Sequence, residues 1–149
     1  MSFDPQSFLD ATFTEANSTK SVPVPVGEYA ALIGKVECRP WTSSKDPSKS
    51  GVALDVTWEI TDANVLALLE RDKATVKQGI MLDMTEAGGL DFGKGKNVTL
   101  GRLREATSLN EPGQPFGFSM LAGRMAKVNV THRVDGDNIY AEVKGVAKL

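Results

Sequence analysis

The side chains in this sequence that could take part in binding chemistry are basic and aromatic residues close together in the chain. Trp41 follows Arg39 and precedes a polar segment that carries Lys45 and Lys49. Binding of single-stranded nucleic acid without sequence readout uses cations for the phosphates and aromatic rings for base stacking. Trp41 is therefore a candidate stacking residue, and the alternative is a ring that closes one end of the fold.

A second group of this kind lies near the C-terminus. Tyr140 shares its strand phase with Lys144, and the preceding strand places Lys127 and Arg133 on its non-apolar side. The remaining cations of this half that are candidate phosphate contacts are Lys94, Lys96 and Arg124. The alternative for each of these cations is an ordinary solvated surface.

The Gly-rich segment 88–95 has the spacing Gly-x4-Gly-Lys, which is typical of a phosphate-binding loop. However, Gly95 stands where such a loop needs its magnesium-binding hydroxyl, and no strand and helix flank the glycines closely. The segment therefore predicts a mobile turn and argues against nucleotide hydrolysis.

Carboxylates offer the other chemistry to consider. Asp55 and Glu59 share the outer face of one predicted strand and Asp83 could lie on a neighbouring strand, but a solvated face produces the same spacing. The phase of His132 places it with the apolar residues as a part-buried structural histidine, and the lone Cys38 is expected to be structural. We expect no metal, no cofactor and no catalysis, and a hydrolase that uses these acids is the weakest interpretation.

Composition indicates one ordinary globular domain. The chain has 149 residues, of which 41% are hydrophobic and 24% charged, with a net charge of −2. Residues 1–93 hold 8 Lys/Arg and 14 Asp/Glu, whereas residues 94–149 hold 9 and 5, so the second half is basic. A single cysteine excludes an internal disulfide, and we find neither a secretion signal nor an apolar stretch of the roughly 18 residues that a membrane span needs.

Residues 1–26 predict an N-terminal arm, because the segment is polar and interrupted by prolines. Within it, Asp4 and Pro5 predict the cap and first turn of a short helix that carries Phe8 and Leu9.

The folded domain is expected over residues 27–149. Trp58 has the phase of its apolar neighbours and predicts core, and Gly34 would permit a bulge. Asp62 and Asn97 are expected to cap two short helices. The segments with strand patterns are 28–41, 52–61, 75–85, 126–134 and 138–149, and the helices are expected over 63–73 and 98–109.

The last two strand patterns are separated by Asp135-Gly136, which predicts a hairpin. Five strands with half-buried alternation, and without regular alternation of strand and helix, predict a mainly β protein with short helices. The specific expectation is a five-stranded, OB-fold-like, partly open antiparallel barrel with an N-terminal arm.

The sequence resembles the small bacteriophage proteins that bind single-stranded DNA. The resemblance is carried by the arm, Gly27 and Tyr29 at the start of the first strand, the Ser50-Gly51 turn, the block GLDFGKGKNVTLGRLREATSLN and the closing hairpin. It implies an OB fold, a role in phage DNA replication or recombination, and a place in the cytoplasm of the infected bacterium.

We therefore expect a non-enzymatic, sequence-independent single-stranded DNA-binding protein with a basic groove and aromatic stacking. Self-association and contact with other phage replication proteins stay open. The alternative is a phage structural or interaction protein that assembles through its arm, because Phe3, Phe8 and Phe13 place aromatic rings on that segment.

Overall fold

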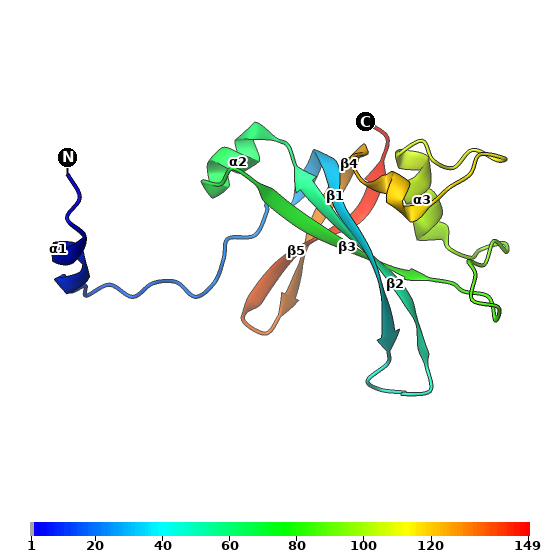
Figure 1. Ribbon diagram of the computed structural model, residues 1–149, viewed down its shortest axis with the longest axis horizontal. Helices are drawn as coiled ribbons and strands as arrows, with labels where there is room; N and C mark the ends of the chain where they lie inside the picture. Colours follow the sequence, from blue (N-terminus) through cyan, green and yellow to red (C-terminus); the bar gives the residue numbers. More distant parts are fainter. Residues whose placement is uncertain (1) are drawn as a thin grey trace.

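The computed structural model describes residues 2–149 and shows a five-stranded sheet that closes into a ring (Figure 1). The strands run round the ring in the order β1-β2-β3-β5-β4, and β4 pairs again with β1. The predicted fold class, a mainly β protein with a five-stranded near-barrel and short helices, is confirmed. The strands are β1 (Gly27–Thr42), β2 (Ser50–Ile60), β3 (Ala74–Leu82), β4 (Met125–Asp135) and β5 (Asn138–Ala147).

The ring is closed unevenly. The prediction that all its strands are antiparallel is wrong. Four neighbouring pairs are antiparallel, whereas β3 and β5 are parallel and meet at a single bridge between Lys77 and Glu142. Strand directions cannot alternate all the way round a ring of five, so one parallel pair is unavoidable. The pairing of neighbouring strands is therefore least extensive between β3 and β5.

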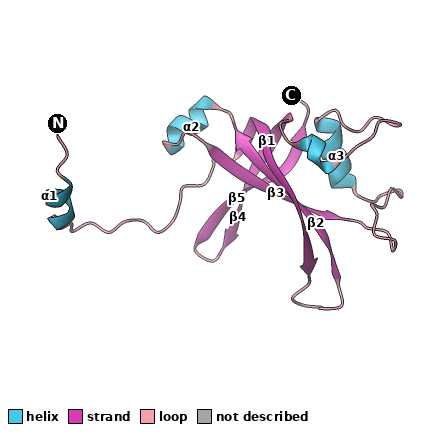
Figure 2. Ribbon diagram, in the orientation of Figure 1, coloured by secondary structure: helices cyan, strands magenta, loops and turns pink. Residues whose placement is uncertain are grey.

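Three short helices accompany the strands: α1 (Pro5–Asp10), α2 (Ala63–Leu69) and α3 (Val98–Ala106) (Figure 2). Asp62 caps α2 as predicted, and the helix ends early because Glu70 is left-handed. Asn97 precedes α3, but its side chain makes no capping hydrogen bond. No helix within residues 2–149 is both long enough and apolar enough to cross a membrane.

The core fills the inside of the ring. The predicted alternation on β2 is confirmed, and Trp58 is fully buried. Its Nε1 donates to Oε1 of Gln78 at 3.0 Å, so the one polar atom of the indole is satisfied inside the barrel. The register of β1 against β2 shifts at Gly34, which confirms the predicted bulge.

The segment before β1 contacts the barrel only near its end. None of the residues of α1 is buried, whereas Val24 is. Lys20 Nζ donates to the carbonyl of Asp137, and Nε2 of His132 lies 2.7 Å from the carbonyl of Val24. His132 is exposed, contrary to the expectation of a part-buried residue, because it lies where the β4–β5 hairpin leaves the barrel.

Candidate nucleic-acid interface

Two hairpins project from the same side of the barrel, at the bottom of Figure 1. The β1–β2 hairpin ends in the loop 43–49, and the β4–β5 hairpin turns at Gly136-Asp137, where Gly136 has a φ of 62°. Because β3 pairs with β2 on one edge and with β5 on the other, its outer face lies between the two hairpins.

This outer face of β3 is a row of four exposed residues, which we call the β3 floor: Thr75, Lys77, Gly79 and Met81. The residues between them are buried, so the strand alternates strictly. Lys77 makes no ion pair with any of residues 2–149. The strand itself is predictable from its sequence pattern, but Lys77 is not recognisable there as a site residue, because the position of β3 between the hairpins depends on the strand order.

On the β1–β2 hairpin, Trp41 lies against Gly51 of the neighbouring strand. A Cβ atom at Gly51 would stand 2.8 Å from Trp41 Nε1, and this nitrogen is shielded from solvent without a hydrogen-bond partner in the part of the chain described. Trp41 is half-buried and lies outside the hydrophobic core. The ring therefore does not close the barrel, and it rests on the hairpin surface.

The loop of the same hairpin holds Lys45 and Lys49 in the exposed positions that the sequence suggested. Its backbone is held by hydrogen bonds from Ser43 N to the Lys49 carbonyl and from Lys49 N to the Asp46 carbonyl, each 2.9 Å. Ser48 Oγ also donates to the Asp46 carboxylate. Both lysine side chains lack an ion pair within residues 2–149.

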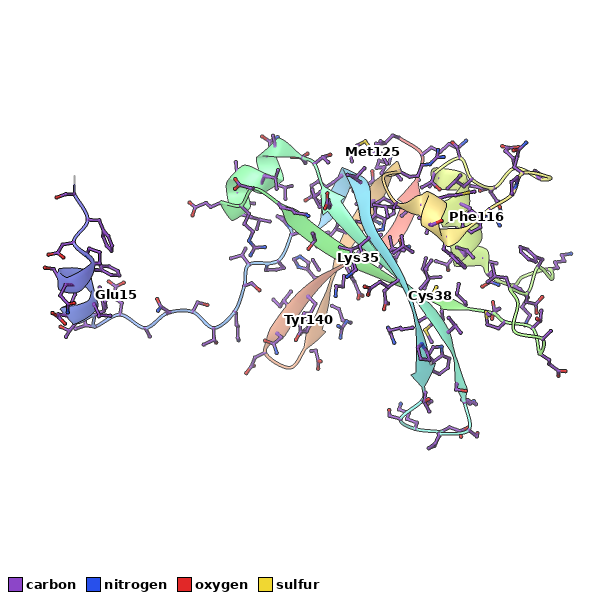
Figure 3. All side chains as sticks on the ribbon, viewed as in Figure 1. Glu15, Lys35, Cys38, Phe116, Met125 and Tyr140 are labelled. Atoms are coloured by element: carbon purple, nitrogen blue, oxygen red, sulfur yellow. The ribbon has the colours of Figure 1, made fainter. Side chains whose placement is uncertain are left out.

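On the β4–β5 hairpin, the guanidinium of Arg133 lies 5.0 Å from the ring centroid of Tyr140. Arg133 Nε is also 3.4 Å from the carboxylate of Glu142. Tyr140 lies on the β4–β5 hairpin (Figure 3), and its side chain remains 44% exposed. Each hairpin thus carries one aromatic ring and one guanidinium group. Trp41 and Arg39 lie on the same strand, whereas Tyr140 and Arg133 lie on paired strands.

The acidic residues beside the β3 floor are engaged in ion pairs. Glu59 accepts from Lys73 at 2.6 Å, and Arg39 Nε donates to Asp55 at 2.6 Å. Arg39 has further N–H groups that could contact a phosphate. Lys45, Lys49 and Lys77 form no ion pair within residues 2–149, and neither does Asp46 of the same loop, whose carboxylate accepts hydrogen bonds from Ser48.

Three of the predicted binding residues, Lys94, Lys96 and Lys127, lie apart from the hairpin tips. Lys127 is at the start of β4, beside Ala30, and is 3.5 Å from Glu28. Ala30 and Trp41 are separated on β1 by up to about 36 Å of strand at 3.3 Å per residue. Lys94 and Lys96 lie on the loop between β3 and α3.

The two remaining predicted cations, Arg124 and Lys144, also lie away from the hairpin tips. Arg124 immediately precedes β4, where its carbonyl accepts from Ile33 N at 2.8 Å. Lys144 lies near the register shift of β5 against β4. The structure therefore distributes the eleven predicted residues over several surfaces, and it brings six of them onto the hairpins: Arg39, Trp41, Lys45, Lys49, Arg133 and Tyr140.

The structure also places the residues that were considered for metal binding and catalysis. Within residues 2–149, no group of three or more His, Cys, Asp or Glu side chains converges to hold a metal ion. Asp55 is paired with Arg39, and Asp83 accepts a hydrogen bond from the backbone N–H of Asn97 at 2.8 Å. Cys38 is exposed.

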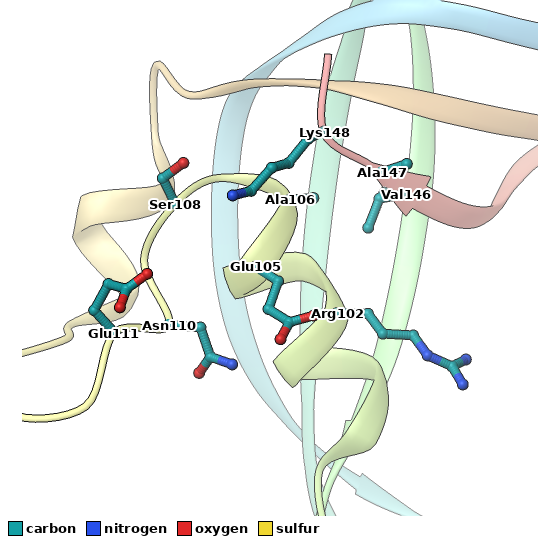
Figure 4. A pocket seen from close by; sticks show the side chains of 9 residues that line it. All are labelled: Arg102, Glu105, Ala106, Ser108, Asn110, Glu111, Val146, Ala147 and Lys148. Carbon is teal, nitrogen blue, oxygen red and sulfur yellow. The ribbon is translucent and has the colours of Figure 1, made fainter.

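A pocket of about 330 Å³ lies between α3 and the end of β5, away from the hairpins (Figure 4). Its walls include two acidic residues, Glu105 and Glu111, and two basic residues, Arg102 and Lys148. This mixture of charges does not favour binding of a polyanion.

No protein-family model matches the chain, and no curated protein matches it. The fold and the geometry of the hairpins are thus the basis on which a function is assigned.

Proposed function

We propose that this protein binds single-stranded DNA, independently of sequence and without catalysis, on the β3 floor between the two hairpins. The observation that carries the proposal is the position of Trp41 and Tyr140 on hairpins that flank the unpaired Lys77. In OB folds the face of strands 2 and 3 and the loops joining strands 1–2 and 4–5 bind oligonucleotides. The resemblance to phage proteins supports a setting in phage DNA replication or recombination.

Two physical contributions combine in the proposed binding of the single strand, one from phosphate neutralisation and one from base stacking. Lys45, Lys49 and Lys77 neutralise backbone phosphates and release counterions, which makes affinity fall with salt. Trp41 and Tyr140 stack bases, each stack contributing about 1–3 kcal/mol regardless of base identity. A duplex keeps its bases stacked on each other, so the protein should prefer the single strand.

The proposal is tested by fluorescence-anisotropy titration of a labelled oligo(dT) and of a duplex of the same length, at low and moderate salt. Tight, salt-sensitive binding of the single strand with quenching of tryptophan emission is the expected result. Equal affinity for the duplex, or no binding at low salt, would overturn it.

A second candidate function is assembly through the N-terminal segment. Phe8 lies 5.4 Å from Phe3 and 6.0 Å from Phe13 between ring centroids, and all three side chains are 59–71% exposed. An exposed aromatic cluster favours docking onto a protein surface. Analytical ultracentrifugation without DNA tests this function: assemblies that dissociate when all three residues are changed to Ala support it, and a monomeric wild type argues against it.

A further inference from the structure

We propose that Phe92, together with the pocket beside it, is a further base-binding site for the same single strand. The inference rests on the proposed function and extends it onto the loop between β3 and α3. Phe92 is 80% exposed, more than either Trp41 or Tyr140. The Gly-rich segment that carries it was expected to be a mobile turn, with Lys94 and Lys96 as candidate phosphate contacts and no role for Phe92.

Hydrogen bonds hold this loop in a defined conformation. Asn97 exchanges three bonds of 2.8 Å with Asp83 and donates a further one of 3.0 Å to the carbonyl of Asp91. Met84 and Leu90 form an isolated bridge across the loop. The Asn97 side chain therefore forms its hydrogen bonds within the loop and does not cap α3. A ring presented on such a loop loses little freedom when a base stacks on it.

The pocket beside Phe92 has a volume of about 130 Å³. Leu90 and Leu100 provide apolar walls, Lys96 provides a cation, and Asn110 provides an amide. The side chain of Asn110 has no hydrogen-bond partner within residues 2–149. An amide can donate and accept, which is the combination that the edges of nucleobases require.

Charge on this part of the loop favours a phosphate backbone. Lys94 and Lys96 form no ion pair within the described chain, whereas the carboxylates of Asp83 and Asp91 accept backbone N–H groups of the loop itself. Glu86 lies on the separate turn closed by the hydrogen bond from Thr85 N to the Gly89 carbonyl. The basic end of the loop is thus the end that holds Phe92.

The loop begins where the β3 floor ends. It follows β3 directly, and Leu82 at the end of β3 pairs with Val52, which is adjacent to Gly51 under Trp41. In Figure 1 the loop extends to the right from the end of β3, whereas the two hairpins extend downwards. A single strand that follows β3 past Trp41 would therefore meet the loop that carries Phe92.

The test compares wild type with Phe92→Ala, Phe92→Tyr and Leu68→Ala, using labelled oligo(dT) and anisotropy. Phe92→Ala should raise Kd by about 5- to 150-fold. Phe92→Tyr should retain most of the affinity, because tyrosine can also stack. Leu68→Ala is the matched control, a large apolar side chain that is 68% exposed on α2, and should bind like wild type. Asn110→Leu should also weaken binding, since it removes the amide.

Photocrosslinking of wild type to oligonucleotides that contain 5-iododeoxyuridine provides a readout that does not depend on a variant. A crosslink mapped to Phe92 supports the site. Absence of any crosslink in residues 90–97, or a Phe92→Ala variant as tight as wild type while Trp41→Ala is weakened, would overturn this inference and leave the proposed function standing. A wild type that binds no single strand would overturn both.

Discussion

Trp41 and Gly51 form a cross-strand pair in which the indole occupies the space that a side chain at position 51 would fill. A Cβ atom there would stand 2.8 Å from Nε1 and 3.1 Å from two ring carbons. Glycine at this position thus lets the ring lie flat on the hairpin. Trp41 is oriented by its neighbour before any ligand arrives, which lowers the entropy lost on stacking.

Replacing Gly51 with Ala should push the indole off the hairpin and weaken oligo(dT) binding by up to the 1–3 kcal/mol of a lost stack. Anisotropy titration measures the change. Gly145→Ala is the matched control, because nothing lies within 4 Å of a Cβ at that strand position. Equal affinities for both variants would mean that the orientation of Trp41 does not matter for binding.

Trp41→Ala should itself weaken single-strand binding by about 1–3 kcal/mol. The thermal midpoint should change little, because Trp41 lies outside the core. The quenching of tryptophan emission by oligo(dT) should also disappear, since the remaining Trp58 is fully buried. Quenching that persists in the variant would place the contact elsewhere.

Lys45 and Lys49 are exposed on the hairpin loop and should contact phosphates. Changing both to Gln should reduce the slope of log K against log salt by about 1.4, at roughly 0.7 per phosphate contact on a single strand. Lys127→Gln is the informative comparison, because Lys127 is paired with Glu28 away from the hairpin tips. A slope that changes with Lys127 and not with the loop lysines would move the interface to the β1–β4 side.

Gln78→Leu should lower the free energy of unfolding by about 1–3 kcal/mol, as measured by urea denaturation. The substitution leaves Nε1 of the buried Trp58 without its acceptor, and an unsatisfied buried donor costs about this much. DNA affinity at low temperature should be retained, since both side chains lie inside the barrel. A variant as stable as wild type would show that the hydrogen bond adds nothing to stability.

Much of the local structure was predictable. The alternation around Trp58, the cap at Asp62, the bulge at Gly34 and the hairpin before Tyr140 each depend on residues only a few positions apart. Phase, capping and turn preference are local properties, so they can be recognised in one sequence. The strands found by these patterns agree with the structure, apart from shifts at their ends.

Burial at the hairpins was less predictable. Ile139 has the phase of a core residue but is 50% exposed, and His132 is exposed for the same reason. Both lie where β4 and β5 extend past the body of the barrel. The alternation of a strand determines which of its two sides a residue occupies. Whether that side is buried depends on how far the strand extends past the neighbouring strands that would pack on it.

Local patterns in the sequence are sufficient to locate the strands, the short helices and the residue types proposed to bind a nucleic acid. Which of these residues share a surface depends on the packing of the strands. Lys77, Trp41 and Tyr140 lie on three strands separated by dozens of residues, and only the order β1-β2-β3-β5-β4 places the first between the other two. Alternation reports the two faces of each strand and carries no information on which strand lies beside it, because that choice depends on how the whole core packs.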